Sequence, residues 1–269
     1  MKRIAKIAGL ALAGLALAQG VFAGGKQEPG GLTIEKGTLT VGMEIGYPPM
    51  EYFDIDGVTP IGFDVQLGKA LADKLGLKVK YVDTAWDGIF AGVNTGKYDV
   101  IISSVTITEE RLKVFNFSAP YIQNAQAIVA AKGSPIKAQG LEDLAGLKVA
   151  YQAETNSDDI MTELGEGGLK FTPLEYDKVI NCFDELRLGR TDAILCDSVV
   201  AYFYAAQPNN PYEIVWEGMG DELGICMKKG NDVLTAAVQG ALDQLYADGT
   251  VQKISRSIFG RDLVSPVRK

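Results

Sequence analysis

The chain has 269 residues, with 26 lysines and arginines, 34 aspartates and glutamates, and no histidine. The lack of histidine excludes a Ser-His-Asp or Cys-His catalytic site and any histidine-ligated metal. The acidic balance disfavours binding to nucleic acid or to an anionic membrane, so we expect no nucleic-acid partner.

The first 23 residues have the pattern of an export signal. A basic start precedes an apolar run over 7–18, which is too short to span a bilayer comfortably. A small-residue cleavage pattern ends at Ala23, so Gly24 is expected to be the first mature residue; an uncleaved membrane anchor is the alternative. No cysteine lies nearby for lipid attachment. We therefore expect a periplasmic protein that begins with a flexible Gly- and Pro-rich spacer over 24–31.

Hydrophobic periodicity predicts alternating strands and helices after the spacer, which is typical of an α/β fold. The predicted strands cover 39–43, 78–82, 98–102, 125–132, 147–151, 192–196, 213–216 and 222–228. The predicted helices cover 62–75, 86–93, 158–164, 178–188 and 233–246, and another helix is expected to start at Thr108. Residues 260–269 are predicted to form a loose tail.

The three cysteines, Cys182, Cys196 and Cys226, lack CxxC spacing, which argues against zinc binding and thioredoxin-like chemistry. We expect either one disulfide between Cys182 and Cys196 or three buried free thiols. The acidic turn over 54–57 resembles a fragment of a calcium loop, but the later glutamate is missing. We therefore expect no metal or other cofactor.

Small hydroxyl side chains follow the strand predicted at 98–102, and an arginine lies shortly beyond them. Ser104 and Thr106 come at the expected strand end, and Arg111 lies in the first turn of the next helix. A guanidinium fork matches the two oxygens of a carboxylate, and hydroxyls supply further donors. The pattern therefore fits a carboxylate receptor, although a capped helix with a solvated arginine would have the same spacing.

Two glycine-led segments have equivalent positions in the chain. Gly96 and Gly189 each open a strand, and eight residues after them lie Ser104 and Asp197, respectively. Ligands of open α/β sheets bind at the carboxyl ends of strands. Asp197 would attract a cation and Arg111 an anion, so the simplest ligand that satisfies both is an α-amino acid.

Other polar and aromatic residues lie near expected strand ends. Tyr47 begins a loop and Trp86 opens a helix, and each could be a ligand wall or a packing residue. The polar run 152–157 precedes a helix, where free amides form a natural cradle for an anion. The alternative is simple N-capping by Asn156 or Ser157.

Five motifs in order resemble the bacterial extracellular solute-binding proteins of family 3, the amino-acid receptors of ABC importers. The resemblance covers essentially all of residues 32–260. The motifs are GYPPMEYFDIDG (46–57), GFDVQLGKAL (62–71), GKYDVIISSVTITEERLKVFNFSAPY (96–121), TNSD (155–158) and GRTDAILCDS (189–198).

The resemblance implies an α/β, two-lobed periplasmic-binding-protein fold of type II with the ligand in the interlobe cleft. Lobe 1 would comprise 32–122 plus 224–262, and lobe 2 would comprise 126–219. The hinge would be 123–125 and 220–223. Such a protein is expected to be a monomer and not an enzyme.

The resemblance also implies which residues hold the main-chain groups of the ligand. Arg111 would bind the α-carboxylate with the help of Thr106 and Asn156. Ser104 and Asp197 would bind the α-ammonium. For Arg111, Ser104 and Asp197 this assignment agrees with the interpretation from the residues alone.

The remaining residues would face the ligand side chain or border the carboxylate. By the same resemblance, Tyr47 and Trp86 would flank the side chain, and Glu44 falls where some relatives carry an acidic side-chain ligand. Thr155 belongs to a segment where relatives usually have glycine-threonine-threonine or serine; here the glycine is replaced by Glu154. Glu154 either points to solvent or points inward, where it would oppose the carboxylate or select an extra ammonium.

The implied function is the binding of a polar L-amino acid and its delivery to the membrane subunits of an ABC transporter by lobe closure. Aromatic walls, Glu44 and no basic residue beyond Arg111 favour arginine or lysine first, then glutamine or histidine. The alternative is a periplasmic cyclohexadienyl (prephenate/arogenate) dehydratase on the same fold, with Glu44 or Glu154 as the general acid.

Overall fold

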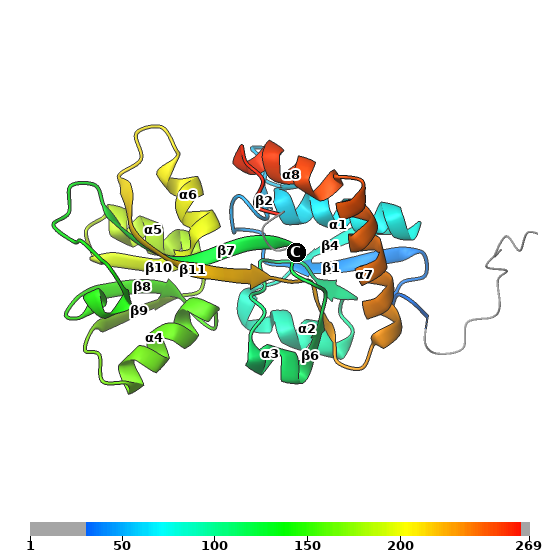
Figure 1. Ribbon diagram of the computed structural model, residues 1–269, viewed down its shortest axis with the longest axis horizontal. Helices are drawn as coiled ribbons and strands as arrows, with labels where there is room; N and C mark the ends of the chain where they lie inside the picture. Colours follow the sequence, from blue (N-terminus) through cyan, green and yellow to red (C-terminus); the bar gives the residue numbers. More distant parts are fainter. Residues whose placement is uncertain (1–30, 265–269) are drawn as a thin grey trace, which may run out of the picture. The chain divides into compact units, whose positions relative to one another are not determined.

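A computed structural model describes residues 31–264 of the chain (Figure 1). The predicted export signal, its cleavage site and most of the spacer lie outside the described residues. Within 31–264, no helix has both the length and the apolar character needed to cross a membrane.

The first of two five-stranded sheets has the strand order β4-β1-β5-β12-β6. Its strands are β1 (Thr38–Met43), β4 (Lys78–Asp83), β5 (Val100–Ile101), β6 (Phe115–Phe117) and β12 (Cys226–Lys228). Strand β1 pairs in parallel with β4 and β5, whereas β12 is antiparallel to β5 and β6. Every residue of β1 is buried, including Thr38 and Thr40, and the Thr40 amide and hydroxyl both donate to the Asp99 carboxylate.

Helices and short elements around this sheet complete the first lobe (Figure 1). Helix α1 packs on α7 and α8, and its C-cap is Gly76, whose positive φ of 69° closes the last turn. The elements are α1 (Phe63–Leu75), η1 (Trp86–Gly88), α2 (Ile89–Thr95), α3 (Glu109–Val114), α7 (Asp232–Ala247), α8 (Thr250–Phe259) and the hairpin strands β2 (Tyr52–Phe53) and β3 (Pro60–Ile61).

The second sheet has the strand order β11-β7-β10-β8-β9 and forms the second lobe. Its strands are β7 (Ile122–Ala131), β8 (Lys148–Gln152), β9 (Thr172–Tyr176), β10 (Ala193–Asp197) and β11 (Tyr212–Leu223). The helical elements are η2 (Leu141–Leu144), α4 (Asn156–Glu166), α5 (Val179–Arg187) and α6 (Ser198–Ala205). The α/β class predicted from the sequence is therefore correct, with two mixed sheets in two lobes.

Strand β11 differs from the prediction of separate short strands at 213–216 and 222–228. It is one 12-residue strand that pairs with β7, and register shifts between Ile214 and Trp216 and between Glu217 and Gly220 interrupt the pairing. The bulges break the period-two pattern on which the prediction depended. The end of the predicted second strand is a separate element, β12.

The predicted loose tail is wrong for residues 260–264. Val264 is fully buried, and the backbone carbonyl of Leu263 accepts a hydrogen bond of 2.8 Å from the Gln123 amide. The hydroxyl of Ser255, in helix α8, donates to the Arg261 carbonyl at 2.9 Å. Contacts with β7 and α8 thus fix a segment that has no periodicity of its own. Residues 265–269 lie outside the described part.

Of the two alternatives for the cysteines, the disulfide between Cys182 and Cys196 is wrong and the set of three buried free thiols is confirmed. All three cysteines lie in the described part of the chain, and each is a buried free thiol. Cys182 is on α5 and Cys196 on β10, where both fill the core as small apolar side chains. Burial raises the pKa of Cys182 and of Cys226 to about 12, so neither is a thiolate near neutral pH.

Candidate functional site

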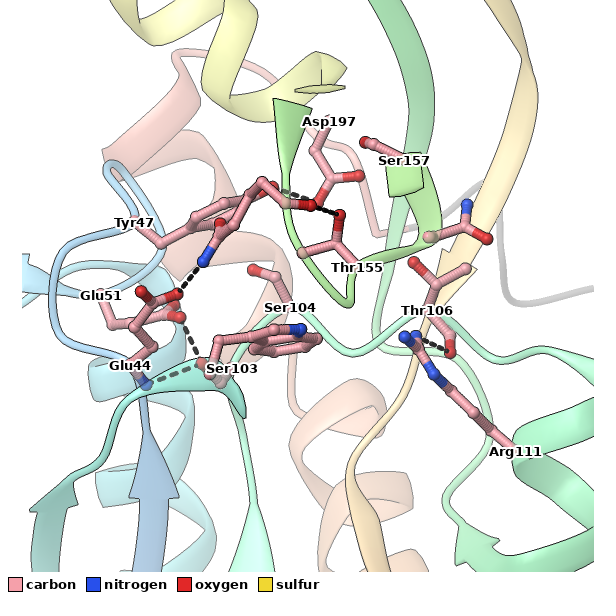
Figure 2. Close-up of a pocket in the computed structure, with 13 residues that line it drawn as sticks. Glu44, Tyr47, Glu51, Ser103, Ser104, Thr106, Arg111, Thr155, Ser157 and Asp197 are labelled. Atoms are coloured by element: carbon pink, nitrogen blue, oxygen red, sulfur yellow. Dashed lines mark hydrogen bonds between the residues drawn. The ribbon is translucent and has the colours of Figure 1, made fainter. Parts of the chain in front are cut away.

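One pocket contains all nine residues predicted from the sequence to bind ligand (Figure 2). The space between its lining side chains is about 350 Å³, which includes space open to solvent. Its lining residues are Glu44, Tyr47, Glu51, Trp86, Ser103, Ser104, Thr106, Arg111, Gln152, Thr155, Asn156, Ser157 and Asp197.

The pocket lies where the carboxyl ends of strands from both sheets meet. Glu44 follows β1 and Ser103 follows β5, while Gln152 ends β8 and Asp197 ends β10. This is the position at which open α/β sheets bind ligands. The topology therefore brings polar side chains from distant parts of the sequence into one site.

Arg111 supplies a guanidinium with most of its donors available. The Thr108 hydroxyl caps helix α3 by accepting from the Arg111 amide at 3.2 Å, and Arg111 Nη1 donates to the Thr106 carbonyl at 3.1 Å. The guanidinium carbon lies 5.1 Å from the Phe90 ring centre and 5.9 Å from that of Trp86. Within the described chain, no carboxylate forms an ion pair with it. The helix is capped as expected, but the arginine is half-buried at the pocket rather than solvated.

The N-terminus of helix α4 borders the same end of the pocket. Thr155 is the N-cap residue, but its hydroxyl donates to the Gln152 carbonyl at 2.7 Å and caps no amide. Ser157 likewise donates its hydroxyl to Gln126 Oε1 at 2.7 Å. The predicted capping by Asn156 or Ser157 is therefore wrong. A first turn that no side chain caps, beside a guanidinium, can bind a carboxylate.

Asp197 has room for one more hydrogen-bond donor. Its Oδ1 accepts from Asn124 Nδ2 at 2.7 Å and Gln126 Nε2 at 2.9 Å, and its Oδ2 accepts from the Tyr47 hydroxyl at 2.7 Å (Figure 2). A carboxylate has about four acceptor sites, so one remains. Burial raises the pKa of Asp197 to about 6. Ser104, with a φ of 50°, also lines the pocket, and its buried hydroxyl has no partner.

Glu44 and Gln152 meet at the pocket, and one acceptor of Gln152 is left without a donor. Gln152 Nε2 donates to Glu44 Oε2 at 2.7 Å and to the Asp177 carbonyl at 3.0 Å. These two bonds fix the orientation of the amide, so Gln152 Oε1 is a buried oxygen without a donor. Burial raises the pKa of Glu44 to about 7, although the nearby charge of Lys178 opposes this shift.

Glu51, which the sequence did not identify, forms one polar side of the pocket together with Ser103, which belongs to the predicted hydroxyl cluster after β5. The Ser103 hydroxyl accepts from the Glu44 amide at 3.0 Å and donates to Glu51 Oε1 at 2.6 Å. Glu51 is fully buried, and its Oε2 has no hydrogen-bond partner. The only sequence signal for this residue was its place within the motif 46–57, which carries no information on burial.

Trp86 is both a core residue and part of the pocket wall. It is 7% exposed and packs with Ile89 and Phe115, yet it also lines the site. Its Nε1 donates to the backbone carbonyl of Glu154 at 2.8 Å, a bond that joins the two lobes. The Glu154 side chain is exposed and lies outside the lining, so the inward-pointing alternative is wrong.

Comparison with known proteins gives the family. The sequence model of the bacterial extracellular solute-binding proteins, family 3, matches residues 39–261. The chain belongs to this family.

The names of similar proteins agree with the assignment of this chain to the solute-binding protein family. The L-cystine-binding protein TcyJ of Escherichia coli K12 is 36% identical over 231 residues, which are 85% of each chain. A probable amino-acid ABC transporter-binding protein of Haemophilus influenzae is 33% identical and covers 84% of this chain and 86% of its own.

A solved structure supports the fold. An ancestral arginine-binding protein bound to arginine is 40% identical, with a TM-score of 0.79, and covers 84% of this chain and 99% of its own. The two-lobed periplasmic-binding-protein fold of type II is thereby confirmed. These relatives are binding proteins, and this chain is likewise a binding protein and not an enzyme.

Proposed function

We propose that this protein binds a basic L-amino acid outside the cytoplasm and delivers it to an ABC transporter. The observation that carries the proposal is the charge pattern of the pocket. One guanidinium, Arg111, shares the lining with three carboxyl groups, those of Glu44, Glu51 and Asp197. A zwitterionic amino acid matches one charge of each sign, and the acidic groups that remain favour a cationic side chain.

The main-chain groups of the ligand are assigned to opposite sides of the pocket. The α-carboxylate would accept from Arg111, from Thr106 after β5, and from Thr155 and Asn156 at the start of α4. The α-ammonium would donate to the open acceptor site of Asp197 and to the unpartnered Ser104 hydroxyl. Paired partners at both ends are required because burying an unpaired charge is costly.

The ligand side chain is assigned to the Glu44 end, between Tyr47 and Trp86. The buried acceptors there, Glu44 Oε and Gln152 Oε1, call for a ligand that donates several hydrogen bonds. A guanidinium has five N–H donors and an ammonium three, whereas a neutral amide has two. We therefore place arginine or lysine first and glutamine or histidine next, with a preference worth about 1–3 kcal/mol.

Lobe closure is the proposed mechanism. In this proposal lobe 1 comprises 32–122 plus 224–262, lobe 2 comprises 126–219, and the chain hinges at 123–125 and 220–223. Support comes from the sheets, since β7 and β11 are the strands through which the chain passes between them. Closure would bury the ligand between contacts that form only in the closed state.

We further propose that the protein acts as a periplasmic monomer after removal of its export signal near Ala23-Gly24. The family of extracellular solute-binding proteins supports this location. The proposed partners are the membrane subunits of an ABC transporter, which the name of the Haemophilus relative supports.

Calorimetric titration tests the ligand assignment. L-arginine and L-lysine should bind more tightly than L-glutamine and L-histidine, and Glu44→Gln should weaken the two strongly cationic ligands selectively. The exposed substitution Glu163→Gln is the matched control and should change no affinity. An equal loss for all ligands in Glu44→Gln would contradict the assignment of Glu44 to the side chain.

Cystine is a second candidate, because the relative TcyJ is named for it and one further cation lies near the Glu44 end. The Lys178 ammonium lies beside Gly46: its Nζ is 3.7 Å from the position that a Cβ on Gly46 would occupy. We infer that this ammonium would bind the second carboxylate of cystine. If cystine is the ligand, it will bind most tightly of the panel, and Lys178→Ala will weaken it. If arginine is the ligand, Lys178→Ala will leave its affinity unchanged or raise it, since a repelling charge is removed.

A further inference from the structure

Two buried carboxyl groups lie near each other at the base of the pocket. Glu51 and Asp64 are both fully buried, and the Asp64 amide donates to the carbonyl of Met50, the residue before Glu51, at 2.9 Å. Glu51 Oε2 and Asp64 Oδ1 are buried carboxyl oxygens without a hydrogen-bond partner. Two carboxylates can only accept hydrogen bonds, so a single proton held between these two oxygens would give each of them a partner.

The surroundings of the pair supply no compensating cation. The ionisable groups that face it are Glu44, Tyr47 and Tyr121, of which Tyr121 donates its hydroxyl to Asp64 Oδ2 at 2.9 Å. No lysine or arginine in the described chain forms an ion pair with either carboxyl. Two full negative charges at this site would therefore repel each other in an environment that stabilises neither.

The pair also holds the backbone that follows β5. The Ser104 amide donates to Asp64 Oδ2 at 2.8 Å, and the Ser103 hydroxyl donates to Glu51 Oε1 at 2.6 Å. Ser104 has a φ of 50°, in the left-handed region that a serine rarely adopts. Two bonds from the carboxyl pair therefore fix a turn that is unfavourable by itself, and both serines line the pocket.

We propose that Glu51 and Asp64 share a single proton, and that this acid–carboxylate pair positions Ser103 and Ser104 for ligand binding. The pair then carries one negative charge instead of two. Burial, followed by repulsion from Asp64, raises the pKa of Glu51 well above its ordinary value, in agreement with a retained proton. The role in ligand binding rests on the proposed function; the shared proton does not.

The sign of the pH effect follows from the raised pKa. In the unfolded chain both groups ionise above about pH 4–5. The folded pair keeps one proton, so its contribution to stability is complete below that pH and is lost progressively as pH rises toward the folded pKa. The protein should therefore lose stability between pH 5 and pH 8 through this pair.

Thermal unfolding of the ligand-free protein tests the shared proton. Glu51→Gln keeps a donor toward Asp64 and an acceptor for Ser103, and Asp64→Asn keeps an acceptor for Ser104 and a donor toward Glu51. In each variant the side-chain amide donates in place of the shared proton, so the remaining carboxyl group can be ionised. Relative to wild type, each should gain roughly 4 °C or more in Tm between pH 5 and pH 8. The double variant should gain no further pH dependence, because one shared proton can be removed only once.

Exposed Glu163→Gln is the matched control and should show no pH-dependent gain. A gain that is flat with pH in both single variants would overturn the shared proton. So would a pH-dependent gain in only one of them, because a proton that belongs to one carboxyl is not shared. None of these results depends on whether the protein binds an amino acid.

The positioning role is tested on the same variants. The amide resonance of Ser104, followed by NMR without ligand, should titrate with the pair in wild type and stay constant in Glu51→Gln. With L-arginine as the probe, Asp64→Asn should bind within a few-fold of wild type, whereas Asp64→Ala should lose tenfold or more. If Asp64→Ala does not fold, the Ser104 resonance decides. A Ser104 resonance that ignores the titration in wild type would overturn the positioning role.

Discussion

The proposed binding of the ligand α-carboxylate depends on Arg111. Its guanidinium is half-buried and donates within the described chain only to the Thr106 carbonyl. It can therefore bind a carboxylate without breaking an ion pair. Because every amino acid carries the same α-carboxylate, this contact should serve all ligands equally. Burial lowers the pKa of Arg111, but a guanidinium remains charged at any physiological pH.

Arg111→Ala should therefore weaken every amino acid that binds by a similar factor. Truncating one partner of a buried, hydrogen-bonded charge pair costs roughly 2–5 kcal/mol, which corresponds to about 30-fold or more in Kd. Lys113→Ala, exposed on the same helix, is the control and should have no effect. Calorimetry on two ligands measures both the loss and its uniformity; a loss confined to one ligand would contradict the role.

Buried carboxyls give binding a pH dependence that differs between ligands. Asp197, with a pKa of about 6 in the free protein, must be ionised to hold the ammonium. Glu44, with a pKa of about 7, must be ionised only to hold a cationic side chain. Glutamine affinity should therefore fall as pH drops below about 6, and arginine affinity below about 7, by up to roughly tenfold per pH unit for each group.

Titrations of both ligands from pH 5 to pH 8 check this prediction. In Glu44→Gln the arginine profile should shift to resemble that of glutamine. Identical profiles for the two ligands in wild type would show that Glu44 does not contact the side chain.

At this scale the sequence identified the residues that have a distinctive type or position. Asp197 and Ser104 follow strand ends at repeated spacing, Arg111 lies just beyond the hydroxyl cluster, and the family resemblance added Glu44 and a ligand-wall role for Trp86. Gln152 and Glu51 could not be found, because their importance depends on fixed amide orientation and complete burial. Neither property has a signature in local sequence.

The turn between β8 and α4 carries Glu154 where the family resemblance implies a glycine. Glu154 has a φ of 59°, in the region that favours glycine, and its amide donates to Asp158 Oδ2 at 2.7 Å. The glycine that relatives usually carry would fit this backbone without steric cost. The substitution to glutamate therefore strains the turn but does not alter the pocket lining.

Glu154→Gly should raise stability by about 0.5–1 kcal/mol, because relief of the left-handed strain exceeds the extra entropy of the unfolded chain. Ligand affinity should stay within about twofold. Glu163→Gly, within helix α4, is the contrast and should lower stability by about 1 kcal/mol. Urea unfolding measures both; a loss of stability in Glu154→Gly would mean that the glutamate side chain contributes more than its exposure indicates.

Elements with clear periodicity were predicted and those shaped by tertiary contacts were not. The β1, α1 and α7 predictions agree with the structure within about one or two residues. Helix α6 (SVVAYFYA) has almost no polar face, so its sequence lacks helical periodicity. Helix α8 is different: Val251, Ile254 and Ser255 form a buried stripe that was present in the sequence and overlooked.

At the scale of the whole molecule, hydrogen bonds join the two lobes directly across the pocket. Tyr47 reaches Asp197, Gln152 reaches Glu44, and Trp86 Nε1 reaches the Glu154 carbonyl. The first two involve groups that we assign to the ligand. The Trp86 bond joins Nε1 to a backbone carbonyl, and we assign no ligand contact to either atom. This bond should therefore favour the closed form whichever amino acid is bound.

Trp86→Phe should weaken all ligands by roughly 2- to 10-fold, because it keeps an aromatic wall but removes a neutral hydrogen bond worth about 0.5–1.5 kcal/mol. Trp216→Phe, the same change at the other tryptophan and away from the pocket, should leave affinity unchanged. Calorimetry measures both variants. Wild-type affinity in Trp86→Phe would show that this bond does not stabilise the closed state.

A thermal-shift screen of the protein against the twenty L-amino acids, cystine, prephenate and arogenate tests the proposed binding of a basic L-amino acid. A ligand that binds only the folded state raises Tm with ln(1 + [L]/Kd). We expect the largest shift with L-arginine or L-lysine and smaller shifts with L-glutamine or L-histidine. A shift with prephenate alone, or no shift with any amino acid, would contradict the proposal.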